Sequence, residues 1–153
     1  MEVLMAVAIT GIVALLTPQI ITHTVKIYVL SRAKLELQRE ARSAMYLVTR
    51  EIRQAQSGSI LIDQMVGQPY YSRIRFSLIQ GTSITIAQSG TSLILTRGNT
   101  STTLSKNLVF LSFTFPRSDD LTIISVAMTL QEQIYNGMYK ALHMASERVR
   151  VMN

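Results

Sequence analysis

The first 25 residues carry a long run of apolar side chains with few polar interruptions. Between Glu2 and Lys26 there is no charged residue. A helix needs about 20 consecutive apolar residues to cross the hydrocarbon core of a bilayer. A cleaved signal peptide would open with basic residues and end at small ones, whereas this segment opens with an acid and runs on into further helix-forming sequence. We therefore predict a retained transmembrane helix over residues 1–25.

Two residues inside this apolar run weaken a helix. Pro18 has no N–H to donate, and Gly11 is conformationally permissive. Neighbouring groups in a membrane can offset the lost hydrogen bond, and a kink is the usual result. Gly11 and Pro18 are therefore either packing features or points of helix flexibility, where the stretch between them bends or unwinds when the protein changes environment.

The pattern changes at Lys26, where apolar residues begin to recur at spacings of three and four. Charged residues occupy the other positions, and Gly58 is placed as the C′ residue that ends the pattern. We predict an amphipathic helix over residues 26–57, continuous with the apolar helix and about 80 Å long with it. Its apolar positions are Leu30, Ala33, Leu37, Ala41, Ala44, Met45, Val48, Ile52 and Ala55.

After Gly58 the period changes from 3.6 to 2, which indicates strands. Short strands joined by tight turns predict an antiparallel meander, with an exposed hairpin tip at 133–140. One apolar face of the sheet should cover the amphipathic half of the helix. The expected fold class is α+β, with 26–153 as one globular domain. The predicted strands lie at 73–78, 83–86, 93–95, 109–115 and 124–130, with 149–151 closing the sheet.

The amino-acid composition excludes several kinds of functional site. The absence of Cys excludes disulfides, thiolate metal sites and thiol nucleophiles. The formal net charge is +6, and most of it comes from 26–53, where seven basic side chains accompany three acidic ones. A basic membrane-proximal helix suits anionic lipid headgroups. The alternative use of the charge is nucleic-acid binding, for which Arg73, Arg75 and Arg97 form a candidate basic patch.

No catalytic or metal-binding constellation is recognisable in the sequence. His23 and His143 are far apart and are interpreted as surface histidines. Asp119 and Asp120 could help to hold a calcium ion, but two adjacent acids shortly after Pro116 are more typical of a turn. We expect no enzymatic activity, no cofactor and no metal.

Residues 2–18 resemble the N-terminal helix of type IV pilins and type II secretion pseudopilins, because a Glu precedes an apolar run with a Gly and a Pro at comparable spacing. Residues 49–55 are similar to the end of the long helix in J-type minor pseudopilins and related minor pilins. Residues 92–97, 104–108 and 148–153 also resemble that group. The resemblance covers most of the chain, with the helix matched best.

The resemblance implies a structural subunit with a pilin-like fold. Its helix would hold it in the inner membrane until it joins a helical filament of pilin-like subunits, with the long helices in the core and the sheet domains outside. A separate ATPase of the inner-membrane assembly platform would supply the work. The resemblance assigns filament assembly to Glu2, which would pair with the N-terminal ammonium of a neighbouring subunit. The simpler role for Glu2 is stabilisation of the helix macrodipole, by about 0.3–1 kcal/mol.

The family also places a short basic leader and a processing site before this Glu, which the sequence lacks. We expect Met1 to be an internal methionine of a longer chain, or the chain to be a truncated form. The leader bears on orientation: Lys26, Arg32 and Lys34 alone would place the large domain in the cytoplasm, and a basic leader would reverse this. We expect a single-pass inner-membrane protein with its C-terminal domain on the periplasmic side.

The lack of a disulfide and the J-like segments favour a minor pilin or pseudopilin that primes or caps a pilus or a secretion pseudopilus. One alternative is a DNA-binding pilin of a DNA-uptake machine. Another is a signal-anchored envelope domain with no filament role.

Overall fold

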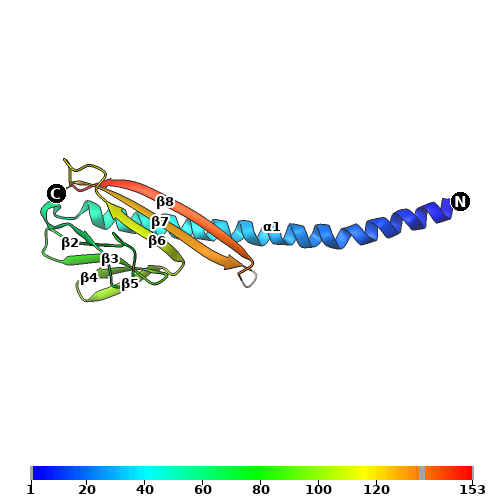
Figure 1. Ribbon diagram of the computed structural model, residues 1–153, viewed down its shortest axis with the longest axis horizontal. Helices are drawn as coiled ribbons and strands as arrows, with labels where there is room; N and C mark the ends of the chain where they lie inside the picture. Colours follow the sequence, from blue (N-terminus) through cyan, green and yellow to red (C-terminus); the bar gives the residue numbers. More distant parts are fainter. Residues whose placement is uncertain (1, 135–136, 153) are drawn as a thin grey trace.

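A computed structural model describes residues 2–134 and 137–152 of the chain. One long helix, α1 (Glu2–Arg53), runs through the molecule, and the strands gather around its C-terminal half (Figure 1). The α+β prediction is confirmed, and the layout is consistent with a pilin-like arrangement. After α1 the chain forms η1 (Ser57–Ser59), β1 (Leu61–Asp63), β2 (Arg73–Ser77), β3 (Ser83–Ser89), β4 (Ser92–Arg97), β5 (Thr100–Ser105), β6 (Leu108–Thr114), β7 (Ile123–Ile134) and β8 (Tyr139–Arg150).

Helix α1 has 52 residues and curves gently along its length (Figure 1). The helix continues through Gly11 and Pro18 without interruption. Thr10 donates its hydroxyl hydrogen to the carbonyl of Ala6 (2.8 Å), as expected for a threonine in an apolar helix, and Thr17 donates to Val13 in the same way (2.7 Å). These bonds satisfy the hydroxyl hydrogens within the helix, which lowers the cost of placing the two threonines in apolar surroundings.

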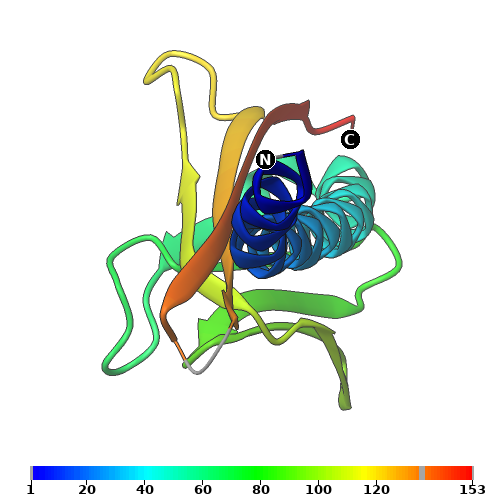
Figure 2. The ribbon, with the colours of Figure 1, turned by 90° about the vertical axis from the view of Figure 1, so that its right-hand side faces the viewer.

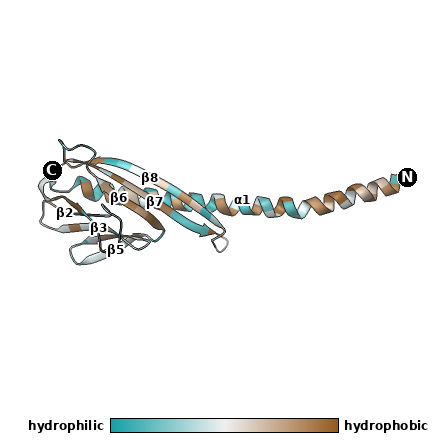
Figure 3. Ribbon diagram, viewed as in Figure 1, coloured by the Kyte–Doolittle hydropathy of each residue, from teal (hydrophilic) through white to brown (hydrophobic). Residues whose placement is uncertain are grey.

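The two halves of α1 lie in different surroundings. The apolar N-terminal half projects away from the sheets, and residues 2–28 are all exposed (Figure 3). The C-terminal half buries one side chain per turn or more in the core. The buried residues of α1 are Ala33, Leu37, Ala41, Ala44, Met45, Val48, Thr49, Glu51 and Ile52. The predicted division of one helix into an apolar half and a half that packs on the domain is therefore confirmed.

The strands form two antiparallel sheets, one with the order β1-β2-β3-β4-β5 and one with the order β6-β7-β8. Seen along the helix, the two sheets cover different sides of α1 (Figure 2). In β7 the buried and partly exposed positions alternate, which places Ile124, Val126, Met128 and Leu130 in the core. The buried side chains of this strand form the face that packs toward α1, as predicted from the period of two.

The prediction of a single meander is wrong, because the sheet divides between β5 and β6. The two-residue connection at Lys106 and Asn107 is held by the helix: Asn107 donates its amide hydrogen to Glu40 Oε2 (3.0 Å). Strand β5 itself was not predicted. Its sequence, TSTTLS, is polar and mostly exposed, so it lacks the apolar alternation by which the other strands were recognised.

Helix α1 also ends earlier than predicted, at Arg53 instead of near Ser57. Ala55 forms an isolated β-bridge with Leu78, and the N–H of Gln56 donates to the carbonyl of Ser77 (2.9 Å). These bonds to the neighbouring sheet compete with further helical turns. Gly58 therefore lies in η1 and does not act as the C′ residue of α1.

Strands β7 and β8 have 12 residues each and form the longest hairpin. The predicted hairpin tip at 133–140 includes 135–136, which lie outside the described residues. The remainder agrees in part: β7 ends at Ile134, β8 begins at Tyr139 and Met138 is exposed, but Ile134 is buried in the core. Figure 1 shows this end of the hairpin directed along α1 toward its apolar half.

Candidate functional site

The N-terminal half of α1 presents a continuous apolar surface that no other described part of the chain covers. It is the one helix among the described residues that is long and apolar enough to cross a membrane. Apolar side chains exposed on it are Val3, Leu4, Met5, Val7, Ile9, Ile12, Val13, Leu15, Leu16, Ile20, Ile21 and Val25. An apolar surface of this size is consistent with a helix that crosses a membrane once.

Glu2 lies in the first turn of α1 and is exposed. Its carboxylate is placed where the unpaired N–H groups of a helix start carry partial positive charge. No ion pair between described residues involves Glu2. Its charge therefore stands at the end of the apolar surface, where a cation from outside the described chain can reach it.

A buried acid, which was not predicted from the sequence, lies at the other end of α1. Glu51 has a side chain that is 1% exposed, and it binds two arginines. Arg50 lies 2.9 Å from Glu51 Oε1, and Arg97 of β4 lies 2.5 Å from Glu51 Oε2. Because Arg97 follows Glu51 by 46 residues, only the register of the sheet brings them together. This pair joins α1 to the five-stranded sheet.

The structure does not gather Arg73, Arg75 and Arg97 into one patch. Arg97 is in register with the buried Ile84 and shares the helix-facing side of the sheet with it. Arg75 is in register with Thr85, the next residue of β3, and so lies on the opposite face with Arg73. All three arginines are bound to acids of this chain, which reduces the charge available for a phosphate backbone.

Asp63 of β1 holds the two outer arginines. It accepts hydrogen bonds from Arg73 at 2.5 and 2.8 Å and one from Arg75 at 2.6 Å. The hydrogen bond from Arg73 is the main reason that the pKa of Asp63 lies below its ordinary value of 3.8, and desolvation partly opposes it. The same bond raises the pKa of Arg73. The short strand β1 is thereby attached to β2 by charge as well as by backbone pairing.

This lowered pKa predicts a pH dependence. Because Asp63 binds a proton less readily in the folded state, its bonds contribute stability above a pH of about 4, and the contribution is lost as the pH falls through the lowered pKa. We expect Asp63→Asn to reduce the free energy of unfolding at pH 7 and to differ little from the native chain at the lowest pH. Urea titrations of both chains in detergent micelles across this range measure the difference. A difference that stays constant with pH would contradict the assignment.

The two adjacent acids considered for calcium are engaged by neighbouring side chains, and their hydrogen bonds lower the pKa of both. Asp119 pairs with Arg117 at 2.7 Å, and Asp120 accepts hydrogen bonds from the N–H and hydroxyl of Thr122, which forms a turn. His23 is exposed on the apolar half of α1, and His143 lies half-buried on β8. Within residues 2–134 and 137–152, no group of three or more His, Cys, Asp or Glu side chains could hold a metal ion.

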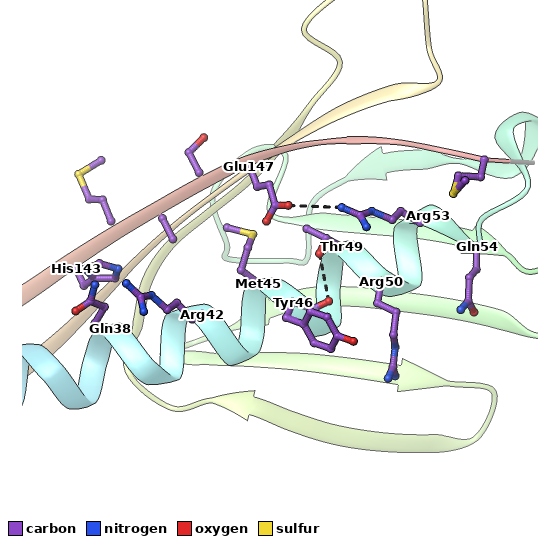
Figure 4. A pocket seen from close by; sticks show the side chains of 14 residues that line it. Gln38, Arg42, Met45, Tyr46, Thr49, Arg50, Arg53, Gln54, His143 and Glu147 are labelled. Atoms are coloured by element: carbon purple, nitrogen blue, oxygen red, sulfur yellow. Dashed lines mark hydrogen bonds and ion pairs between the residues drawn. The ribbon is translucent and has the colours of Figure 1, made fainter.

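A groove of about 970 Å³, which was not predicted, lies between α1 and β8 (Figure 4). Its helix side carries Arg42, Tyr46, Arg50 and Arg53, and its strand side is formed by residues 143–147. Arg53 and Glu147 approach each other across it, with 3.8 Å between the charged atoms. Residues that are distant in the sequence form this groove, so no local motif marks it.

A scan against protein-family models found no match, and searches of curated proteins and of solved structures found none either.

Proposed function

We propose that this chain is a structural minor pilin or pseudopilin, held in the inner membrane by the N-terminal half of α1. It assembles with other pilin-like subunits to prime or cap a pilus or a secretion pseudopilus. Its sheet domain lies on the periplasmic side and then on the outside of the filament. It catalyses no reaction, and the assembly platform with its ATPase supplies the work.

The observation that carries the proposal is the division of α1 into an uncovered apolar half and a packed half. An apolar half that the rest of the chain leaves exposed is suited to lipid, and it is also suited to packing against the same half of neighbouring subunits. The continuous helix keeps this half in line with the sheet domain (Figure 1). Transfer from membrane to filament then changes the neighbours of the helix without unfolding the domain.

Glu2 supports the proposal because it offers a charge at the end of the apolar surface. A carboxylate that enters an apolar filament core is costly unless a cation pairs with it. The N-terminal ammonium of the adjacent subunit is such a cation. The pair would fix the axial position of each subunit relative to the next, since it forms at one register only.

The first test is the N-terminal sequence and intact mass of the protein from its native membrane. We expect a start a few residues before Glu2, with an N-methylated apolar residue, as prepilin processing produces. A start at Met1 would mean that no prepilin peptidase acts on the chain, and a signal-anchored envelope domain would then be the better account.

The second test measures neighbours of the apolar surface. The chain has no Cys, so a single cysteine introduced at Leu16 gives an unambiguous crosslinking site. We expect a photoactivatable crosslinker attached to the cysteine of Leu16→Cys, which inserts into C–H bonds, to join the chain to other pilin-like chains in the native membrane. A matched cysteine at the exposed Tyr70, on the sheet domain, should give far less of these products. Equal yields from both positions would contradict packing through α1.

A further inference from the structure

Strand β8 is the outer strand of the three-stranded sheet, and its 12 residues make it a long edge. Among the described residues, no strand pairs with its outer side. An unpaired edge of this length presents a row of backbone donors and acceptors, and proteins usually shorten, bend or cover such an edge. Here the edge borders the groove beside α1 (Figure 4).

The register shows which backbone groups are free. The N–H of Val151 donates to the carbonyl of Thr122 (2.8 Å), and Val149 and Glu147 follow in register with Ile124 and Val126. In an antiparallel ladder the backbone groups of alternate residues point to opposite sides. Odd-numbered residues of β8 therefore direct their backbone groups to β7. The even-numbered residues that direct them to the free edge are Leu142, Met144, Ser146 and Arg148.

The helix side of the groove is basic. Three arginines line it, Arg42, Arg50 and Arg53, against one glutamate, Glu147. Arg50 is already bound to Glu51, and Arg53 reaches Glu147 only at 3.8 Å. No ion pair between described residues involves Arg42. The groove therefore favours carboxylates on the face of a ligand that meets α1.

Two neighbouring apolar side chains lie on the outer face of the edge, between the exposed Lys140 and Ser146. Leu142 and Met144 are 52% and 77% exposed, and they lie on the face of β8 turned away from α1. A strand added beside β8 would place alternate side chains next to these two residues and the others over the basic side of α1. From Gln38 to Arg53 the groove follows about 22 Å of helix, the length of about seven extended residues.

We propose that the free edge of β8 and the basic side of α1 bind an extended segment of a partner protein, with acidic and apolar side chains in alternation. The segment adds a strand to the sheet, as in peptide recognition by β-augmentation. The backbone of β8 supplies the hydrogen bonds, the arginines of α1 select the acidic face, and Leu142 with Met144 selects the apolar one. The inference does not rest on a role in filaments, because it concerns the chain and a peptide alone.

The test uses the full chain in detergent micelles and an acetylated, amidated peptide of about ten residues that alternates valine and glutamate. Amide hydrogen exchange is followed by NMR. We expect the peptide to slow exchange of the Met144 and Ser146 amides by about tenfold or more, with little change at Ala145 and Glu147, whose amides already face β7. A peptide of the same composition in two blocks, and one that alternates valine and lysine, should not do this.

Two variants locate the binding. Ser146→Pro removes an edge N–H that no other described strand uses, and we expect it to weaken peptide binding about tenfold, whereas Ser146→Ala keeps the N–H and the affinity. Arg42→Glu should weaken binding similarly. Arg39→Glu is its control, since Arg39 is exposed on the same helix outside the groove lining.

Three outcomes would overturn the proposal: unchanged edge amides at millimolar peptide, equal effects of the block or lysine peptide, or equal losses in Arg42→Glu and Arg39→Glu. Misfolding of Ser146→Pro would be visible in the exchange of the β7-facing amides. In that event Arg42→Glu, a surface change on a helix, decides the question alone.

Discussion

Glu2→Gln is expected to remove the protein from filaments while leaving it in the membrane. The substitution keeps size and shape but removes the charge, so the ammonium of the adjacent subunit would enter the apolar core without a partner. Leaving one member of a buried ion pair unpaired costs about 3–5 kcal/mol, which corresponds to a loss of incorporation of about 100-fold or more. The helix itself loses only the macrodipole term, about 0.3–1 kcal/mol.

The measurement is the ratio of filament-associated to membrane-associated protein after shearing, with the Leu16→Cys crosslink as a second readout. Glu36→Gln is the matched control, because Glu36 is an exposed carboxylate of the same helix that pairs with Arg32 on the surface. We expect it to leave the ratio unchanged. If Glu2→Gln assembles as well as the control, the carboxylate serves only the helix start, and the assignment of Glu2 to assembly fails.

The division of α1 was predictable because it depends on local patterns. A run without charges and a stripe at spacings of three and four each identify their own part of the helix, and the buried apolar residues from Ala33 to Ile52 all belong to the predicted stripe. The alternation at 124–130 likewise gave the core positions of β7. Each of these signals needs only neighbouring residues, so a single sequence suffices to read it.

What could not be predicted depends on pairings between distant segments. The end of α1 at Arg53 is followed by the bridge from Ala55 to Leu78, and the break between the two sheets lies where Asn107 binds Glu40. The candidate basic patch was chosen from residue type, whereas the register places Arg97 on the opposite face from Arg75. The groove arises in the same way, where α1 meets the edge of β8.

Arg97→Ala is expected to lower the free energy of unfolding by about 3 kcal/mol. Arg97 supplies one of the two bonds to Glu51, whose side chain is 1% exposed and cannot turn to water. Its removal leaves a buried carboxylate with Arg50 alone. Replacing the acid as well, in Glu51→Leu with Arg97→Ala, removes the buried charge, so the double variant should recover part of the loss. Urea titration of the full chain in detergent micelles measures each value.

Arg75→Ala is the matched control, because the two arginines differ little in exposure, at 47% and 49%, and each binds an acid. Asp63 is more exposed than Glu51 and keeps Arg73, so we expect Arg75→Ala to cost less than about 1 kcal/mol. The contrast separates the burial of the acid from the mere presence of an ion pair. Equal losses in the two variants would show that Glu51 is not a buried attachment of α1 to the five-stranded sheet. A clear excess for Arg97→Ala would mean that the bond to the buried Glu51 contributes to the attachment of α1 to the five-stranded sheet.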